Sequence, residues 1–388
     1  MPSRTCHRRV PFSLAVALLL AALLGGVGAA DTAEAPTNDD QLTQHARTEL
    51  GKFTTWLRSN QAKGLIGEVG WPSGPDGEAE RWNAVAERWY RDADAADLWV
   101  TAWATGEWWG SYPLAAYRDQ TDRPGIDTMG AQAAVIERHS TTPSRQRGVN
   151  VAGAEFAAPS VEPKSGFSNT NRGTYERDYH YDGQGTFAYL ASRGVKLVRL
   201  PFRWERIAPR LGGPLYRAEL RRLKGAVARA DRAGLRVVLD MHNYGGYYLS
   251  DGRQGVRRTL GTAKLPLSSF ADVWRRLSVH FRSNTAVVGY GLMNEPAEMA
   301  SARSTPPRVL WERASQAAVT AIRANRDQRW VMVSAYPWGS VWSFGASHPR
   351  AWIRDPARRV RYEAHQYFDH DNSGTYRLGY AGESRQLR

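Results

Sequence analysis

The stretch "KGLIGEVGWPSG", residues 63–74, places a strand-like apolar run around a carboxylate, Glu68, near the start of the chain. A second apolar run, "DLWVTAWATG" (97–106), follows soon after it. Helix-like segments flank the two runs at 40–62, 77–94 and 129–140. Apolar runs that alternate with helices are typical of βα units and a parallel sheet.

The same alternation recurs six times between about residues 148 and 370. The strand candidates are "GVNVAGAEF" (148–156), "VKLVRLPF" (195–202), "LRVVLDMH" (235–242), "AVVGYGLMNE" (286–295), "RWVMVSAY" (329–336) and "VRYEAHQYF" (360–368). Six units are two short of the usual closed barrel of eight, and the two early runs supply the missing pair. We therefore expect one (β/α)₈ TIM barrel over 31–388, with two strands from 40–147 and six from 148–388.

Residues 1–30 have the pattern of a secretory signal. Arg4, Arg8 and Arg9 precede the apolar run "FSLAVALLLAALLGGVGA", and small residues lead up to Ala30. A membrane anchor is the alternative, but the run is at the short end for a bilayer span and an acidic segment follows it. We expect a secreted, extracellular protein with no stable membrane insertion after cleavage. The single cysteine, Cys6, lies in this leader, so the mature chain can form no disulfide.

The formal net charge of +14 raises the question of an acidic partner. Arginines are spread over helical faces such as 216–234, and no nucleic-acid motif accompanies them, so we expect no nucleic-acid partner. Attachment to an acidic cell-wall polymer remains an open alternative that can coexist with catalysis. The histidines show no metal-ligand spacing, and "HDNSGTYR" (370–377) departs from a calcium loop. We expect no metal, no cofactor and a monomer.

Asn294-Glu295-Pro296 ends a strand candidate, where barrel enzymes collect catalytic groups. Hydrolysis of a glycosidic bond needs two carboxyl groups, so a second one must lie nearby. The segments "RLPFRW" (199–204), "DMHNYGGYY" (240–248), "GLMNEP" (291–296) and "HQYFDHDNSGTY" (365–376) resemble the successive strand-end motifs of glycoside hydrolase family 5, the cellulase-type branch of the retaining barrel glycosidases.

In that family a second glutamate, the nucleophile, ends the seventh strand, and a sugar-stacking tryptophan follows the eighth. The given sequence ends only about twenty residues after the sixth motif, whereas "GLIGEVG" (64–70) resembles the seventh strand and "VTAWATGEWWGSY" (100–112) the eighth. The resemblance thus implies a circularly permuted barrel, with strands 7 and 8 ahead of strands 1 to 6. A cut in a surface connection is tolerated because the ends of a closed barrel are neighbours. A fusion of fragments from two tandem genes is the alternative.

The resemblance implies two catalytic residues and two residues that support them. Glu68 would be the nucleophile that forms a glycosyl-enzyme intermediate. Glu295 would protonate the leaving oxygen and then activate water. Asn294 would bind the sugar 2-hydroxyl, and Arg199 would keep the nucleophile ionised.

Four further residues are implied as substrate-binding groups. His242, His365 and Tyr367 would orient the substrate or the carboxylates, and Trp103 would stack on the central sugar. Glu383, in "YAGES", is the rival nucleophile if the chain is not permuted, although no apolar strand precedes it.

Aromatic side chains stack on the C–H faces of sugar rings, so their placement suggests subsites. Candidates in loops after strands are Trp108, Trp109, Trp204, Tyr247, Tyr248, Trp338 and Trp342. Those expected in the core, on helices, are Trp56, Trp82, Trp89, Trp274 and Trp311.

The sequence thus predicts a secreted, retaining, endo-acting glycoside hydrolase that cleaves β-1,4-glucan in polysaccharide breakdown. β-Mannan or mixed-linkage glucan is the alternative substrate, since barrel enzymes vary specificity through their loops. A non-catalytic carbohydrate-binding barrel is the alternative of another class.

Overall fold

The computed structural model describes residues 40–387, apart from 75–76, 120–125, 141–145, 162–165 and 303. The predicted leader, 1–30, lies outside the described residues. Over the described part of the chain, none of the helices is both long and apolar enough to cross a bilayer.

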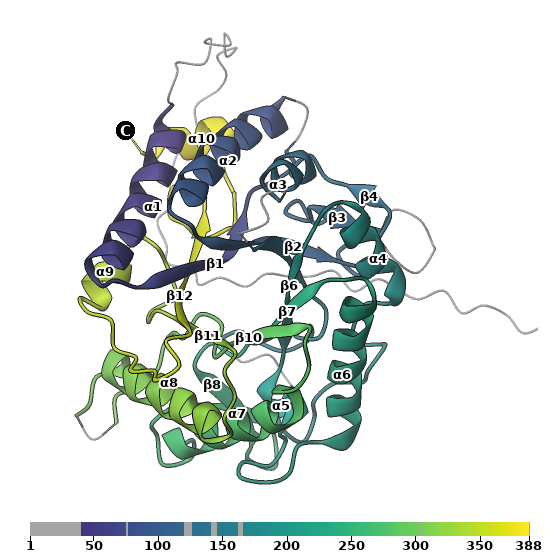
Figure 1. Cartoon of the computed structure of the whole chain (residues 1–388), viewed down its shortest axis with the longest axis vertical. Coiled ribbons are helices and arrows are strands. Elements are labelled where there is room, and N and C mark those ends of the chain that lie inside the picture. The colour runs from purple at the N-terminus through teal and green to yellow at the C-terminus, as the bar shows by residue number, and fades with distance from the viewer. Residues whose placement is uncertain are drawn as a thin grey trace, which may run out of the picture. The chain divides into compact units, whose positions relative to one another are not determined.

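Eight parallel strands form a closed ring, seen along its axis in Figure 1. They are β1 (Lys63–Gly70), β2 (Trp99–Gly106), β5 (Arg147–Val151), β6 (Leu197–Phe202), β7 (Arg236–Met241), β10 (Val287–Gly291), β11 (Trp330–Ser334) and β12 (Val360–Tyr367). Neighbours along the chain are neighbours in the ring, and β1 closes it by pairing with both β12 and β2. The predicted eight-stranded parallel barrel is therefore confirmed, and each predicted strand is present with shorter bounds in most cases.

Helices surround this ring (Figure 1). They are α1 (Gln41–Ser59), α2 (Glu78–Ala95), α3 (Ala133–His139), α4 (Gln184–Ser192), α5 (Trp204–Ile207), α6 (Arg217–Arg232), α7 (Leu267–Phe281), α8 (Pro307–Ala324), α9 (Phe344–Ser347) and α10 (Gly379–Arg385). Two short strands, β3 (Tyr117–Arg118) and β4 (Thr128–Met129), extend β2, and β8 (Gly246–Ser250) pairs with β9 (Gly255–Thr259) as a separate hairpin.

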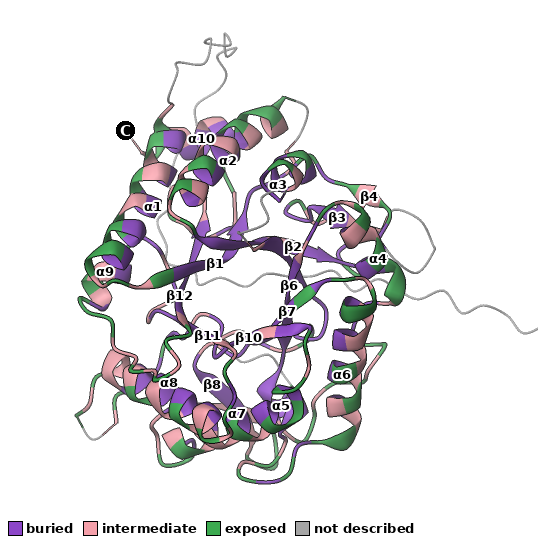
Figure 2. Ribbon diagram, viewed as in Figure 1, coloured by how far each residue is buried: buried purple, intermediate pink, exposed green. Residues whose placement is uncertain are grey.

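The helices pack on the ring through apolar stripes of helical period. In α7, Phe270, Trp274, Leu277 and Phe281 are buried at spacings of three and four residues, so one face meets the strands. Figure 2 shows the same division throughout, with buried strands inside and exposed residues on the outer faces of the helices. The buried interior thus holds the strands rigidly and fixes the side chains at their carboxyl ends.

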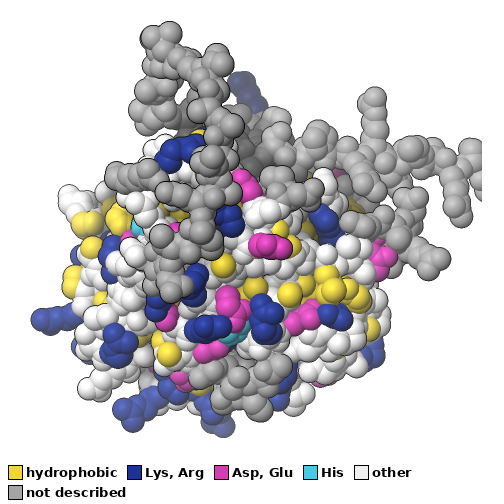
Figure 3. Space-filling view, turned by 90° about the horizontal axis from the view of Figure 1, so that it is seen from above, with side chains coloured by type: hydrophobic (Ala, Val, Ile, Leu, Met, Phe, Trp, Pro, Cys, Tyr) yellow, Lys and Arg dark blue, Asp and Glu magenta, His cyan; other side chains and the backbone are white. Residues whose placement is uncertain are grey.

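Basic and acidic side chains are interspersed on one face of the molecule. On the face drawn in Figure 3, Lys and Arg side chains lie in several places, with Asp and Glu side chains among them.

Candidate active site

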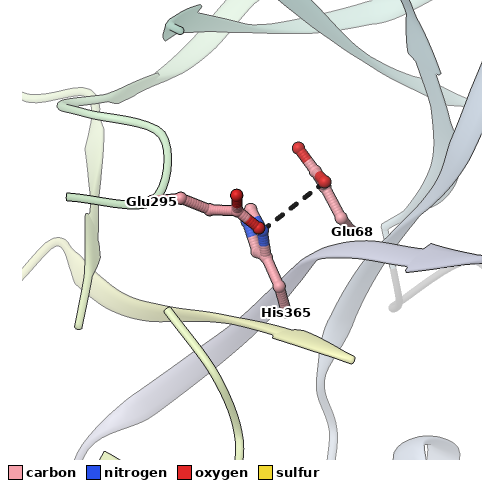
Figure 4. Close-up of side chains that lie close together, drawn as sticks. All are labelled: Glu68, Glu295 and His365. Carbon is pink, nitrogen blue, oxygen red and sulfur yellow. Dashed lines mark hydrogen bonds and ion pairs between the residues drawn. The ribbon is translucent and has the colours of Figure 1, made fainter. Parts of the chain in front are cut away.

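The two predicted catalytic glutamates face each other at the carboxyl end of the barrel. Glu68 is on β1 and is almost fully buried, and Glu295 follows the end of β10 by four residues and is partly exposed. A carboxylate oxygen of Glu68 and one of Glu295 lie within 4.8 Å of each other. His365, from β12, lies between them (Figure 4), with its Nδ1 2.8 Å from Glu295 Oε1 and 3.6 Å from Glu68 Oε2.

Two donors bind the Glu68 carboxylate. The Tyr367 hydroxyl donates to Oε2 at 2.7 Å, and an Arg199 guanidinium N–H donates to Oε1 at 3.1 Å. Burial and the Glu68 charge raise the pKa of Tyr367 well above its usual value, so Tyr367 keeps its proton and remains a donor. Donors on both oxygens hold the Glu68 carboxylate in a fixed orientation.

Arg199 is fully buried and joins several strands of the barrel. It donates to Asn150 Oδ1 at 2.8 Å and to Asn294 Oδ1 at 2.7 Å. It also forms ion pairs with Asp240 at 2.9 Å and Glu363 at 3.0 Å. Burial lowers the pKa of Arg199, but the negative charges of Asp240, Glu363 and Glu68 outweigh the effect of burial and raise that pKa. Arg199 is therefore a permanent positive charge beneath the site.

His365 also contacts a second, deeper carboxylate. Its Nε2 lies 3.4 Å from Oε1 of Glu363, which precedes it by two residues on β12. Burial disfavours the charged ring, but Glu68, Glu295 and Glu363 together raise the pKa of His365 to about 10. The ring is thus an imidazolium at neutral pH. Gly67 makes room for this contact, because a Cβ there would lie 2.1 Å from Glu363 Oε1.

His242, the other predicted histidine, has the opposite electrostatics. Burial lowers its pKa well below the usual value, so the ring is neutral. Its Nδ1 lies 2.8 Å from Asp240 Oδ2, and its Nε2 lies 3.2 Å from Asn294 Nδ2, so the ring donates to the former and accepts from the latter. Burial raises the pKa of Asp240 to about 7, against the effect of Arg199. His242 therefore fixes the orientation of the Asn294 amide.

Trp103 lies beside this cluster on β2 and is partly exposed. Its ring stacks on His242, with centroids 5.6 Å apart and planes at 19°. The structure thus brings together all eight predicted site residues: Glu68, Glu295, Asn294, Arg199, His242, His365, Tyr367 and Trp103.

Sequence reasoning missed three buried residues of the cluster, namely Asn150, Asp240 and Glu363. Asp240 precedes His242 by two residues, and Glu363 precedes His365 by two, so each pair points to the same side of its strand. That period of two, inside a buried strand, is the signal that could have identified them.

The structure corrects four of the seven proposed sugar-stacking aromatics. Trp109, Trp204, Tyr247 and Tyr248 are buried, the last two because they belong to the β8–β9 hairpin. Trp108, Trp338 and Trp342 are exposed, as expected. The five tryptophans expected in the core are all buried.

The rival nucleophile Glu383 lies on α10, and among the described residues it forms no hydrogen bond or ion pair with Glu68, Glu295 or His365. It is buried and accepts from the His370 ring at 2.5 Å and from the Leu378 backbone N–H at 3.2 Å. These contacts give Glu383 a structural role in closing the C-terminal segment.

Two sets of side chains have the composition of a metal site among the described residues: Glu68, Glu295 and His365, and separately Glu107, His180 and Asp182. In both, the histidine is held between carboxylates. Asp182 and Glu107 raise the pKa of His180 in spite of burial. Glu68, Glu295 and Glu363 raise the pKa of His365 in the same way. Binding of a metal at either set would therefore require the histidine ring to lose a proton.

Two facing carboxylates at the carboxyl end of an eight-stranded parallel barrel define a site of the glycosidase class. Residues 149–386 match the family model described as cellulase, glycosyl hydrolase family 5. The chain belongs to this family.

Individual relatives carry related names. The chain is 28% identical over 243 residues to a manganese-dependent endoglucanase of Phanerodontia chrysosporium, covering 60% of this chain and 55% of that protein. It is 29% identical over 231 residues to endo-β-1,4-glucanase A of Emericella nidulans, covering 59% of this chain and 62% of that protein. An endoglucanase of Pseudomonas stutzeri, solved with cellobiose, is 36% identical with a TM-score of 0.50, covering 59% of this chain and 62% of that one. The chain thus spans little more than half of the curated relatives' lengths.

Proposed function

We propose that this protein is a retaining endo-β-1,4-glucanase whose catalytic pair is Glu68 and Glu295. The observation that carries the proposal is that one oxygen of Glu68 and one of Glu295 lie within 4.8 Å of each other, with His365 between the two carboxylates. Retaining glycosidases hold their two carboxyl groups about 5–5.5 Å apart, whereas inverting enzymes need about 6.5–9.5 Å to admit a water molecule.

In the first step, a Glu68 oxygen attacks the anomeric carbon while Glu295 gives its proton to the leaving glycosidic oxygen. Arg199 and Tyr367 donate to the two Glu68 oxygens and hold the carboxylate in position for this attack. Glu295 is assigned the acid role because it is partly exposed beside His365, whereas Glu68 is held by the Arg199 guanidinium.

In the second step, Glu295 takes a proton from water, the resulting oxygen bonds to the anomeric carbon, and Glu68 leaves as a carboxylate. Asn294 is held by Arg199 on its oxygen and by His242 on its nitrogen, so it presents a fixed amide to the sugar 2-hydroxyl. Trp103 offers a ring face to the sugar in the central subsite.

A β-1,4-glucan is favoured as substrate because the relatives are named endoglucanases and one was solved with cellobiose. β-Mannan and mixed-linkage glucan are the alternatives within the family. A non-catalytic carbohydrate-binding barrel would bind glucan without releasing sugar. We also propose export with removal of residues 1–30, which N-terminal sequencing of the secreted chain would test.

We propose in addition that the barrel is a circular permutant of the family's usual order. The family match begins at residue 149, on β5, so β1 and β2 precede it in the chain. In the ring, however, β1 and β2 lie between β12 and β5, the position that the seventh and eighth strands hold next to the first. Because Glu68 is on β1, the permuted order supplies the nucleophile from the strand that the family uses.

The chain itself offers a test of the permutation. Asp40, the N-cap of α1, accepts a hydrogen bond from the Tyr380 hydroxyl on α10, so the two ends of the described barrel are adjacent. A gene that joins residue 387 to residue 40 through a short Gly/Ser linker, and opens the chain within 141–145, would place β5 first. We expect it to fold and to retain activity. An unfolded or inactive product would contradict the proposed correspondence of strands.

The function is tested by measuring reducing-sugar release from hydroxyethyl-cellulose, mixed-linkage glucan and mannan, with Glu68→Gln and Glu295→Gln beside the wild type. We expect hydrolysis of a β-1,4-glucan and a loss of about 10³-fold or more in each variant, with unchanged circular dichroism. Glucan binding without sugar release, unaffected by Glu295→Gln, would instead support the binding-module alternative.

A further inference from the structure

The opposite end of the barrel from the active site carries a concentration of cations around two tryptophans. Trp99 begins β2 and Trp330 begins β11, and their rings lie 5.7 Å apart. The Arg361 guanidinium lies 4.1 Å from the Trp99 ring centroid and 4.9 Å from that of Trp330. Lys63 and Arg359 lie over Trp330 at 5.3 and 5.8 Å.

Trp99, Trp330 and Arg359 border an open hollow of about 440 Å³ at the amino ends of the strands, and Lys63 and Arg361 lie beside it, against the two tryptophans. Its lining includes Trp99, Trp330, Arg236, Arg329, Arg359 and Gln146. We call this hollow the lower-mouth pocket. Its volume is in the range of small-ligand sites, and it lies at the far end of the strands from Glu68 and Glu295.

Most cations in and beside the lower-mouth pocket form no ion pair with an acid of the described residues. Among the described residues, Lys63, Arg236, Arg359 and Arg361 form no ion pair with a carboxylate, whereas Arg329 lies 3.4 Å from Asp327. This excess of positive charge is local, since the arginines of the outer helices commonly pair with nearby acids, as in the Arg276–Asp272 contact at 2.6 Å.

Arg361 is the most unusual member of the group. It is only 4% exposed, donates to the Gly64 carbonyl at 2.8 Å, and has an Nε–H with no acceptor. Burial, with Arg147 nearby, lowers its pKa to about 10 in spite of Asp97. A buried guanidinium that has lost water without gaining a carboxylate would be stabilised by an anion at the pocket mouth.

We propose that the lower-mouth pocket binds carboxylate groups of an acidic, uronic-acid-bearing polysaccharide and so anchors the enzyme beside its substrate. Arg236 and Arg359 are exposed at the rim and can each hold a carboxylate through two N–H donors. Trp330 is partly exposed between them and offers an apolar surface to the sugar ring. A glycan is favoured over a nucleic acid because the catalytic end of the same chain is built for a glycan, a step that rests on the proposed function.

The test compares two double variants that remove the same charge. Arg236→Gln/Arg359→Gln alters the pocket, and Arg217→Gln/Arg221→Gln alters two exposed arginines on α6. Binding to polygalacturonate, neutral dextran and duplex DNA is measured by affinity electrophoresis at low and at physiological ionic strength. Hydrolysis of neutral mixed-linkage glucan is measured in parallel, so that failure of this proposal is separable from failure of the catalytic one.

We expect polygalacturonate to bind the wild type in a salt-dependent way, and the pocket variant to bind about tenfold more weakly or worse. The α6 variant should change affinity by about twofold at most, and hydrolysis should be unchanged in both. Equal weakening in the two variants would mean that net charge alone attracts the polymer. No binding, or stronger pocket-dependent binding of DNA, would also overturn the proposal.

Discussion

Replacement of Glu363 by Gln should change the pH dependence of catalysis, although Glu363 does not face the substrate site directly. The substitution keeps the size of the side chain but removes the negative charge 3.4 Å from His365 Nε2 and 3.0 Å from Arg199. Because Glu363 is one of three carboxylates that raise the pKa of His365 to about 10, its loss must lower that pKa.

The size of the effect follows from the contact that is lost. A hydrogen bond to a charged group contributes about 1.5–3 kcal/mol, which corresponds to about one to two pKa units. Removing the Glu363 charge lowers the proton affinity of the cluster that Glu68, Glu295 and His365 form. The alkaline limb of the kcat/KM profile should therefore move to lower pH by about one to two units.

The same shift has a consequence for stability. The folded pKa of His365 lies above its unfolded value, so its contribution is fully present below about pH 6.5 and is lost as the pH rises through about 10. In Glu363→Gln the loss should be complete at lower pH, and breaking the buried pair with Arg199 should cost about 3–5 kcal/mol at neutral pH.

The assay is the pH profile of kcat/KM on a soluble glucan, together with the ¹⁵N shift of the His365 ring across the titration. Glu219→Gln is the matched control, since Glu219 is buried on α6 and accepts from the Tyr179 and Tyr181 hydroxyls. The control should lose stability without moving the profile. A Glu363→Gln enzyme whose rate falls equally at every pH would refute the electrostatic role and leave only a packing role.

Three further predictions follow from the site. Trp103→Ala should raise KM about tenfold with little change in melting temperature, because the ring face is lost but the core is not; steady-state kinetics with calorimetry checks this. Glu383→Gln should lower the free energy of unfolding by about 1–3 kcal/mol and leave kcat/KM unchanged, since Glu383 accepts hydrogen bonds from His370 and Leu378 of the C-terminal segment. Urea unfolding and steady-state kinetics measure the two quantities, and a large fall in kcat/KM would contradict the prediction. Dialysis against EDTA should not reduce activity, because the proposed steps use only two carboxylates and water; restoration by Mn²⁺ after a loss would contradict this.

The barrel was predictable because each strand is an apolar run and each helix has a face of regular spacing. β1 illustrates the point: "KGLIGEVG" is buried over its whole length after Lys63, as its apolar residues predict. The position of Glu68 beside Glu295 could be expected only from the family resemblance, because no local pattern relates residues 227 positions apart.

The contacts beneath the site were not predictable in the same way. A single acid in a buried strand, such as Asp240 or Glu363, has no meaning until its partners Arg199 and His365 are placed. The loop aromatics show the converse error. Tyr247 and Tyr248 follow a strand in sequence, but the chain turns into a hairpin that packs inward, and burial there depends on tertiary contacts.

The central claim is that Glu68 is the nucleophile of a catalytic pair with Glu295. A 2-deoxy-2-fluoro-cellobioside with a good leaving group would slow the second step more than the first and so accumulate the covalent intermediate, which peptide mass spectrometry can locate. We predict the sugar on the peptide that contains Glu68, with no labelling in Glu68→Gln. A label on Glu383 or any other carboxylate, with Glu68 unmodified in an active enzyme, would contradict the account.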